Sequence, residues 1–277
     1  MEHQNHPENT RLHDPARQTT LDLYNQGLED VPESMWDASR LLVLNLGNNK
    51  ITHLPDSFGS LKHLRMLDMG HNRLAAIPAS IGTLKQLRFL YLSDNGFASV
   101  PDSLGRLKEL RYLNLTDNRL TGLPAALGKL TKLIELRLYN NQIEALPPSL
   151  GRLKNLRELY AMNNQLTSLP RSIGRCKQLR KLMLENNRIA SLPEEVGKME
   201  QLTDLDLRFN NLSTLPESMG KLKNLRFLDL RANRLSDLPK SLARLRRLEK
   251  LDLRWNRFTT IPGWISQIEK RGCTVYF

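Results

Sequence analysis

The chain has 277 residues, of which 40% are apolar and 25% are charged, and these proportions are typical of a soluble protein. It contains no run of about 18 apolar residues, so we expect no membrane-spanning helix. The formal net charge of +12 leaves binding to anionic partners open, which makes the placement of the basic residues important.

Residues 1–17 are polar and contain three of the six histidines without any hydrophobic periodicity. We expect a flexible polar tail here, because few of these side chains would pack against a core. The stretch also lacks the apolar core of a secretory signal, so the sequence identifies no export signal.

A 23-residue unit then repeats without insertion or deletion over residues 18–270. A fixed period of this size predicts a solenoid, in which stacked units form one elongated domain and contact mainly their neighbours. We therefore expect one repeat domain over 18–270 and a C-terminal capping strand over 271–277. The eleven copies begin at Gln18, Leu41, Leu64, Leu87, Leu110, Leu133, Leu156, Leu179, Leu202, Leu225 and Leu248.

From Leu41 onward each copy reads L-x-x-L-x-L-x-x-N-x-L-x-x-L-P-x-x-L-G-x-L-x-x. The L-x-L core alternates with a period of two, which predicts a short strand with one buried face. The asparagine at position 9 is expected to bond backbone groups of adjacent copies, because a buried amide must satisfy both its donor and its acceptor.

The second half of each copy carries a Leu-Pro step and then a Leu-Gly or Ile-Gly pair, as at Leu127-Gly128. With no room for long helices, these residues predict short 3₁₀ or α turns on the outer side. We expect the glycine to provide the backbone φ that is needed where the turn ends.

The first and last copies depart from the pattern in ways that predict caps. In the first copy, Trp36 occupies the position of the glycine. In the last copy, Trp264, Ile265 and Ile268 have helical spacing. The alternation of Cys273, Val275 and Phe277 then predicts a strand that covers the last open edge of the sheet.

The motif L-x-x-L-x-L-x-x-N-x-L, as in LRYLNLTDNRL and LRFLDLRANRL, resembles the leucine-rich repeat family. The 23-residue form with LPxxIGxLxxL resembles its Ras-suppressor and plant intracellular Ras-group members, and bacterial cytoplasmic members. The resemblance implies an α/β solenoid, a curved leucine-rich repeat with a parallel concave sheet and short 3₁₀/α turns on the convex side. It also implies a protein partner, such as a small GTPase or another signalling protein, on the concave face formed by repeat positions 3, 5, 7 and 8.

Nine of the sixteen aromatic residues occupy those concave positions, although the repeat does not require them there. Aromatic and methionine side chains are enriched at the energetic centre of protein interfaces, so we predict a protein-binding site. The alternative is that aromatic rings merely pack well across an open sheet. The densest group lies on five consecutive strands: Phe89, Tyr91, Tyr112, Tyr139, Tyr160, Met162 and Met183.

The C-terminal third is more polar, with aspartate at position 5 and arginine at position 7. Two adjacent columns of opposite charge predict either a second contact zone that selects the partner or a solvated ladder of little energetic value. The residues assigned to this zone are Asp206, Arg208, Phe227, Asp229, Arg231, Asp252, Arg254 and Trp255.

Positions 20, 22 and 2 carry 20 of the 41 basic residues and form a band along the convex edge. Such a band offers an alternative function, electrostatic binding of nucleic acid or of an anionic membrane. Because no aromatic residues are interleaved for base stacking, we favour a solubilising surface.

Catalysis has no support in the sequence. Among the histidines only His71 falls on the concave face, and no His–Cys–Asp cluster or phosphate-binding glycine loop is present. We expect a non-enzymatic, monomeric binding module without metal or cofactor. Because Cys176 and Cys273 are more than four repeats apart, we expect reduced thiols and a cytoplasmic location. A secreted bacterial effector that binds a host protein is a further alternative.

Overall fold

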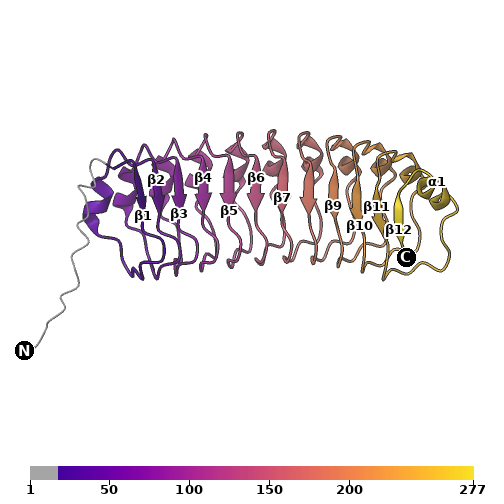
Figure 1. Ribbon diagram of the computed structural model, residues 1–277, viewed down its shortest axis with the longest axis horizontal. Coiled ribbons are helices and arrows are strands. Elements are labelled where there is room, and N and C mark those ends of the chain that lie inside the picture. The colour runs from indigo at the N-terminus through magenta and orange to yellow at the C-terminus, as the bar shows by residue number, and fades with distance from the viewer. Residues whose placement is uncertain (1–17) are drawn as a thin grey trace, which may run out of the picture.

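The computed structural model describes residues 18–277, and the predicted tail, residues 1–17, lies outside the described residues. Residues 18–277 form a curved solenoid with a single twelve-stranded parallel sheet whose strands follow chain order (Figure 1). The predicted α/β solenoid is therefore confirmed. The strands are β1 (Thr20–Asp22), β2 (Val43–Asn45), β3 (Met66–Asp68), β4 (Phe89–Tyr91), β5 (Tyr112–Asn114), β6 (Glu135–Arg137), β7 (Glu158–Tyr160), β8 (Lys181–Met183), β9 (Asp204–Asp206), β10 (Phe227–Asp229), β11 (Lys250–Asp252) and β12 (Thr274–Tyr276).

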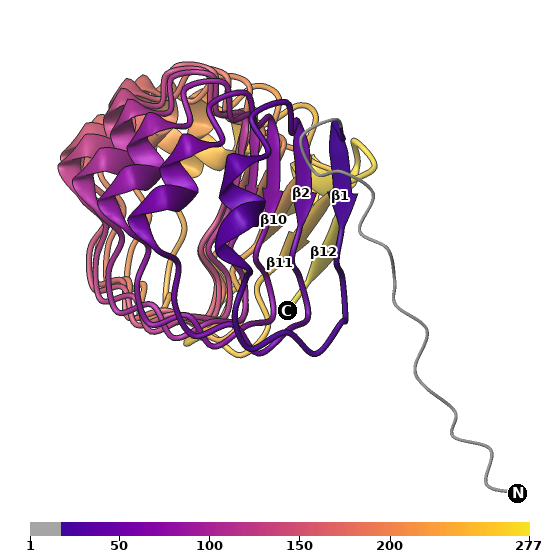
Figure 2. The same cartoon turned by 90° about the vertical axis from the view of Figure 1, so that its left-hand side faces the viewer.

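The register of the sheet follows directly from the constant repeat length. Each residue of β1 to β10 pairs with the residue 23 positions further on, as Leu113 of β5 does with Leu136 of β6. Leucines at positions 4 and 6, such as Leu113 and Leu115, are fully buried. Their columns form the core between the sheet and the turns that face it across the solenoid (Figure 2).

The convex side is built from 3₁₀ turns that begin after the repeated proline. Pro124, for example, is extended (φ −67°, ψ 146°), and the turn starts at the next residue. The predicted short turns are thus confirmed as 3₁₀ in ten copies of the described chain. They are η2 (Glu33–Asp37), η3 (Asp56–Ser60), η4 (Ala79–Thr83), η5 (Asp102–Arg106), η6 (Ala125–Lys129), η7 (Pro148–Arg152), η8 (Arg171–Arg175), η9 (Glu194–Lys198), η10 (Glu217–Lys221) and η11 (Lys240–Arg244).

The prediction for the repeated glycine was wrong in its physical reason. Within residues 18–277 only Gly27 and Gly272 have a positive φ among the glycines, and neither belongs to this column. A Cβ added at Gly151 would instead lie 2.3 Å from the carbonyl oxygen of Ser172 in the next turn. The glycine is therefore needed because consecutive turns approach each other too closely for any side chain.

The asparagine column forms the predicted hydrogen bonds. The Asn141 amide donates to the carbonyl oxygens of Leu115 and Leu138, each at 2.9 Å. Its Oδ1 accepts from the backbone N–H of Leu120 at 3.0 Å. Each such asparagine therefore satisfies backbone groups of its own repeat and of the preceding one, which links the turns after successive strands.

The residue at position 8, which precedes the asparagine (Gln26 in the first copy), has a left-handed backbone in all eleven copies of the described chain. In the first eight copies it is Asn, Asp or His, which are the non-glycine residues that tolerate this conformation best. In the last three copies it is Phe209 (φ 53°), Ala232 (φ 51°) and Trp255 (φ 60°). Two bulky side chains thus occupy a conformation that disfavours them.

Both ends carry units that differ from the repeat. Trp36 is buried and meets Phe58 edge-on, with ring centroids 5.8 Å apart. At the other end, helix α1 (Ile265–Glu269) precedes β12, which pairs with β11. Phe277, the last residue of the predicted alternation, is 45% exposed rather than covered. None of the helices within 18–277 has the length and apolarity required to cross a membrane.

Candidate functional site

The concave face is the face of the sheet turned away from the 3₁₀ turns, and the predicted site residues fall into two zones along it. The aromatic zone consists of Phe89, Tyr91, Tyr112, Tyr139, Tyr160, Met162 and Met183, on or directly after β4 to β8. The polar zone consists of Asp206, Arg208, Phe227, Asp229, Arg231, Asp252, Arg254 and Trp255, on or directly after β9 to β11.

Neighbouring rings in the aromatic zone are held against each other. The rings of Tyr91 on β4 and Tyr112 on β5 are 4.8 Å apart between centroids and tilted by 38°. Burial raises the pKa of Tyr112 to about 12, so its hydroxyl stays protonated at neutral pH. Phe89 projects furthest, at 40% exposure, whereas Tyr139, Met162 and Met183 are half-buried.

Arg137 joins the two halves of the aromatic zone. Its guanidinium carbon lies 5.6 Å from the ring centre of Tyr112 and 5.3 Å from that of Tyr160. Its Nε donates to Glu135 at 2.6 Å. Cation–π contact on two rings and a charged hydrogen bond therefore fix one side chain from three directions.

Sequence reasoning missed Arg137, together with Glu135 and Glu158. The Tyr160 hydroxyl donates to Glu158, which also lies 3.4 Å from the Lys181 ammonium. The signal was present, because these residues occupy concave positions 3 and 5.

In the polar zone the arginines are paired with carboxylates. Arg231 donates to Asp229 at 2.6–3.0 Å, and its Nε lies 3.5 Å from Asp252. Arg254 donates to Asp252 at 2.7 Å. Arg208 bridges Asp206 and Glu185. The two predicted columns thus hold each other in fixed positions and largely cancel in charge.

The aspartates of this ladder differ in their protonation. Burial raises the pKa of Asp206 to about 6, even though the backbone N–H and the charge of Arg208 act against the rise. Burial acts in the same direction on Asp252, but hydrogen bonds from Arg254 and the charges of Arg231 and Arg254 outweigh it and lower the pKa. Asp206 is therefore the carboxyl that titrates nearest to neutral pH among these two.

Exposed rings flank the ladder. Phe209 and Trp255, with centroids 6.2 Å apart, are 44% and 64% exposed. The Arg254 guanidinium lies 5.1 Å from the ring centre of Tyr276, a residue that the repeat pattern did not indicate. A hollow of about 190 Å³, lined by Met183, Asp206 and Phe227 among others, connects the polar zone with the aromatic zone. The two zones therefore form one continuous face along the sheet.

Residues 18–277 contain no group of three or more His, Cys, Asp or Glu side chains that could hold a metal ion. His71 contacts the Asp94 carboxylate at 2.7 Å, but both side chains are exposed. Cys176 and Cys273 are buried free thiols, and burial raises the pKa of each to about 11. Neither thiol is therefore activated as a nucleophile.

Three solved structures show the same architecture. A plant peptide hormone receptor, RGFR1, in complex with RGF2 gives a TM-score of 0.72 at 28% identity over 87% of this chain and 44% of that chain. The ectodomain of the receptor kinase GASSHO1/SCHENGEN3 from Arabidopsis thaliana, in complex with CASPARIAN STRIP INTEGRITY FACTOR 2, gives 0.75 at 30% identity over 89% and 33%. A leucine-rich repeat protein of Leptospira interrogans gives 0.51 at 25% identity over 95% and 97%.

This chain spans less than half the length of those two plant receptors. Comparison with curated proteins finds no match. A leucine rich repeat family model matches residues 18–74, 55–97 and 177–235, a leucine-rich repeat region model matches 101–182, and a further leucine rich repeat model matches 247–268. With these matches and this solenoid, the chain belongs to the leucine-rich repeat proteins.

Proposed function

We propose that this protein is a non-enzymatic binding module that takes a protein partner on its concave face, centred on the aromatic zone. The observation that carries the proposal is the arrangement of Arg137 against Tyr112 and Tyr160. Tyrosine and arginine dominate the energetics of protein interfaces, and these three side chains are fixed before any partner arrives. Little side-chain entropy is then lost on binding.

The sheet that carries the aromatic zone and the similar solved structures support the same function. The zone lies on a rigid sheet whose every strand is bonded to its neighbours, and its charged groups are already paired. Two similar structures are plant receptors in complex with RGF2 and with CASPARIAN STRIP INTEGRITY FACTOR 2. Proteins of this architecture therefore include ones that bind other molecules.

The partner class that we propose is a signalling protein, such as a small GTPase, bound by a monomeric protein in the cytoplasm. The family resemblance motivates the partner class. The buried, unpaired thiols of Cys176 and Cys273 suit a reducing compartment. Cell fractionation combined with identification of captured proteins tests both points, and capture of secreted proteins alone would contradict them.

The test of the concave site is capture from native lysate with the double variant Tyr112→Ala and Tyr139→Ala. We expect the bound protein to be lost, since truncating interface tyrosines costs about 2 kcal/mol or more each at energetic centres. The control is Tyr24→Ala, which removes a tyrosine that is 51% exposed on the concave side of the first repeat. A partner that survives the double variant, with the fold intact by circular dichroism, would overturn the proposal.

A further inference from the structure

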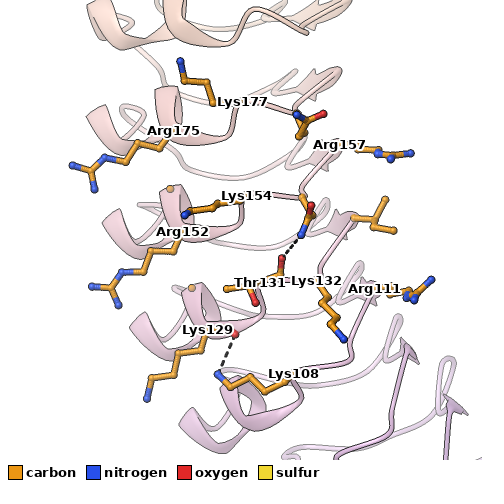
Figure 3. A pocket seen from close by; sticks show the side chains of 15 residues that line it. Lys108, Arg111, Lys129, Thr131, Lys132, Arg152, Lys154, Arg157, Arg175 and Lys177 are labelled. Atoms are coloured by element: carbon orange, nitrogen blue, oxygen red, sulfur yellow. Dashed lines mark hydrogen bonds between the residues drawn. The ribbon is translucent and has the colours of Figure 1, made fainter.

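A groove of about 1170 Å³ runs along the edge of the solenoid where each 3₁₀ turn leads into the next strand (Figure 3). It crosses the repeats between η5 and η8. Its uncharged lining includes Gly128, Gly151, Thr131, Ile134 and Asn155. The residues that line it include no carboxylate and no aromatic ring. Its cations are Lys108, Arg111, Lys129, Lys132, Arg152, Lys154, Arg157, Arg175 and Lys177.

The positive charge of this groove is left uncompensated. Within residues 18–277, Lys132 is the one member of the nine that forms an ion pair, with Glu109 at 2.6 Å. The arginines of the polar zone, in contrast, are paired with carboxylates. The Lys108 ammonium donates to the backbone carbonyl of Lys129 at 3.1 Å, and partial burial followed by the charge of Lys129 lowers its pKa. Within residues 18–277, no ion pair thus relieves the repulsion among the other eight cations.

The cations form rows parallel to the solenoid axis. Lys129, Arg152 and Arg175 extend from the ends of successive 3₁₀ turns on one side, and Arg111 and Arg157 extend from the strand side (Figure 3). Adjacent strands of a sheet are about 4.8 Å apart, so the row of Lys129, Arg152 and Arg175 repeats its charge at roughly that interval. Ile134 interrupts the row of Arg111 and Arg157, whose charges are therefore roughly twice as far apart. In the row of Lys154 and Lys177 the next member is Glu200, and the groove ends before it.

We infer that this groove binds a linear polyphosphate chain, which lies along the solenoid axis between the rows of cations. Arginine and lysine both pair strongly with phosphate oxygens. A linear anion can contact cations along the whole length of the rows, whereas a compact anion such as a phosphorylated ring would contact only a few of them. The absence of aromatic rings among the lining residues removes the stacking platforms that single-stranded nucleic acids use. This site is separate from the concave face and does not rest on the function proposed for it.

The test compares phosphate, tripolyphosphate and long-chain polyphosphate by isothermal titration calorimetry on the full chain. We expect affinity to rise with chain length until the groove is filled. We also expect log K to fall linearly with log salt concentration, because each phosphate contact releases a counterion. Affinity that is independent of chain length would overturn the linear geometry.

A matched pair of variants locates the site. Arg152→Gln, Lys154→Gln and Arg157→Gln together remove three charges from the centre of the groove, and we expect about a tenfold or greater loss of polyphosphate affinity. The control removes three exposed charges of the same band that do not line the groove, and we expect less than about a twofold change. An equal loss in both variants would show only a general charge effect and would overturn the site. The control substitutions are Lys221→Gln, Lys223→Gln and Arg244→Gln.

Three other anionic ligands test whether the groove prefers polyphosphate. Inositol hexakisphosphate, mixed-sequence single-stranded RNA and vesicles containing phosphatidylserine are each compared with polyphosphate of matched charge at 150 mM salt, which is about physiological ionic strength. We expect polyphosphate to bind most tightly. Tighter binding of any of the three competitors would overturn the assignment, and so would unchanged polyphosphate binding in the groove variant.

Discussion

At the scale of single residues, the most informative position is position 8, because its left-handed backbone favours asparagine, aspartate or histidine and the last three repeats supply none of these. The left-handed conformation costs an ordinary L-residue roughly 1–2 kcal/mol relative to its preferred regions, and asparagine tolerates it better. Phe209 and Trp255 adopt it while keeping their rings exposed. The fold would be more stable with asparagine at either position, so its stability does not explain the two rings. This favours a role for both rings in binding beside the polar zone.

We therefore predict that Phe209→Asn and Trp255→Asn together raise the free energy of unfolding by about 1 kcal/mol and weaken capture of the concave-face partner. The control is Ala232→Asn, which lies between them with the same backbone (φ 51°) and carries no ring. This single substitution should give about half of that gain of stability, without an effect on capture. Urea unfolding measures the first quantity, and a net loss of stability in the double variant would contradict the argument.

At the scale of elements, the close approach of consecutive 3₁₀ turns determines which residue fits at the repeated glycine position on the convex side. The sequence predicted the turns themselves, because Pro and Gly recur at fixed positions. It did not reveal why the glycine recurs, because glycine is used both for left-handed backbone and for close contact, and one sequence does not distinguish these reasons. A Cβ added at Gly151 would lie too close to the carbonyl oxygen of Ser172, which shows that close contact is the reason.

Gly151→Ala is expected to destabilise the solenoid by about 1–3 kcal/mol, since its Cβ would overlap the backbone of the next turn and force the two apart. Gly122→Ala is the matched control, because no atom lies within 4 Å of the Cβ added there. That change should be neutral or slightly stabilising through the reduced freedom of the unfolded chain. Thermal unfolding compares the two, and equal midpoints would show that the turns separate at little cost.

At the scale of the whole molecule, the 23-residue period predicted nearly all of the fold, including strand order and register. The candidate site was predicted less completely. The positions of Tyr112 and Tyr160 on the concave face followed from the repeat, but the bridging role of Arg137 depends on side-chain directions that spacing does not contain. The groove was visible in the sequence only as a basic band, because its hollow shape arises from the stacking of the turns.

The molecule distributes its charge unevenly, because the arginines of the polar zone are paired with carboxylates and eight of the nine groove cations form no ion pair within residues 18–277. Its net charge bears on its response to pH. Lowering the pH adds positive charge to a chain that already carries +12, so acid should destabilise the whole solenoid. Asp206 acts in the opposite direction. Its pKa is about 6 in the folded protein and 3.8 as the ordinary value, so the folded state binds the proton more tightly.

Comparison of the wild type with Asp206→Asn isolates this contribution. Because the folded pKa is raised, the stability that Asp206 contributes is fully present below about pH 4 and is lost as the pH rises through about 6. The unfolding free energy of the wild type, relative to the variant, should therefore increase by on the order of 2–3 kcal/mol between pH 7 and pH 4. Asp252→Asn is the control of opposite sign, since the pKa of Asp252 is lowered and its stabilisation is lost on acidification. Urea unfolding at a series of pH values measures both differences, and a pH-independent difference for Asp206→Asn would show that its carboxyl is not desolvated by the fold.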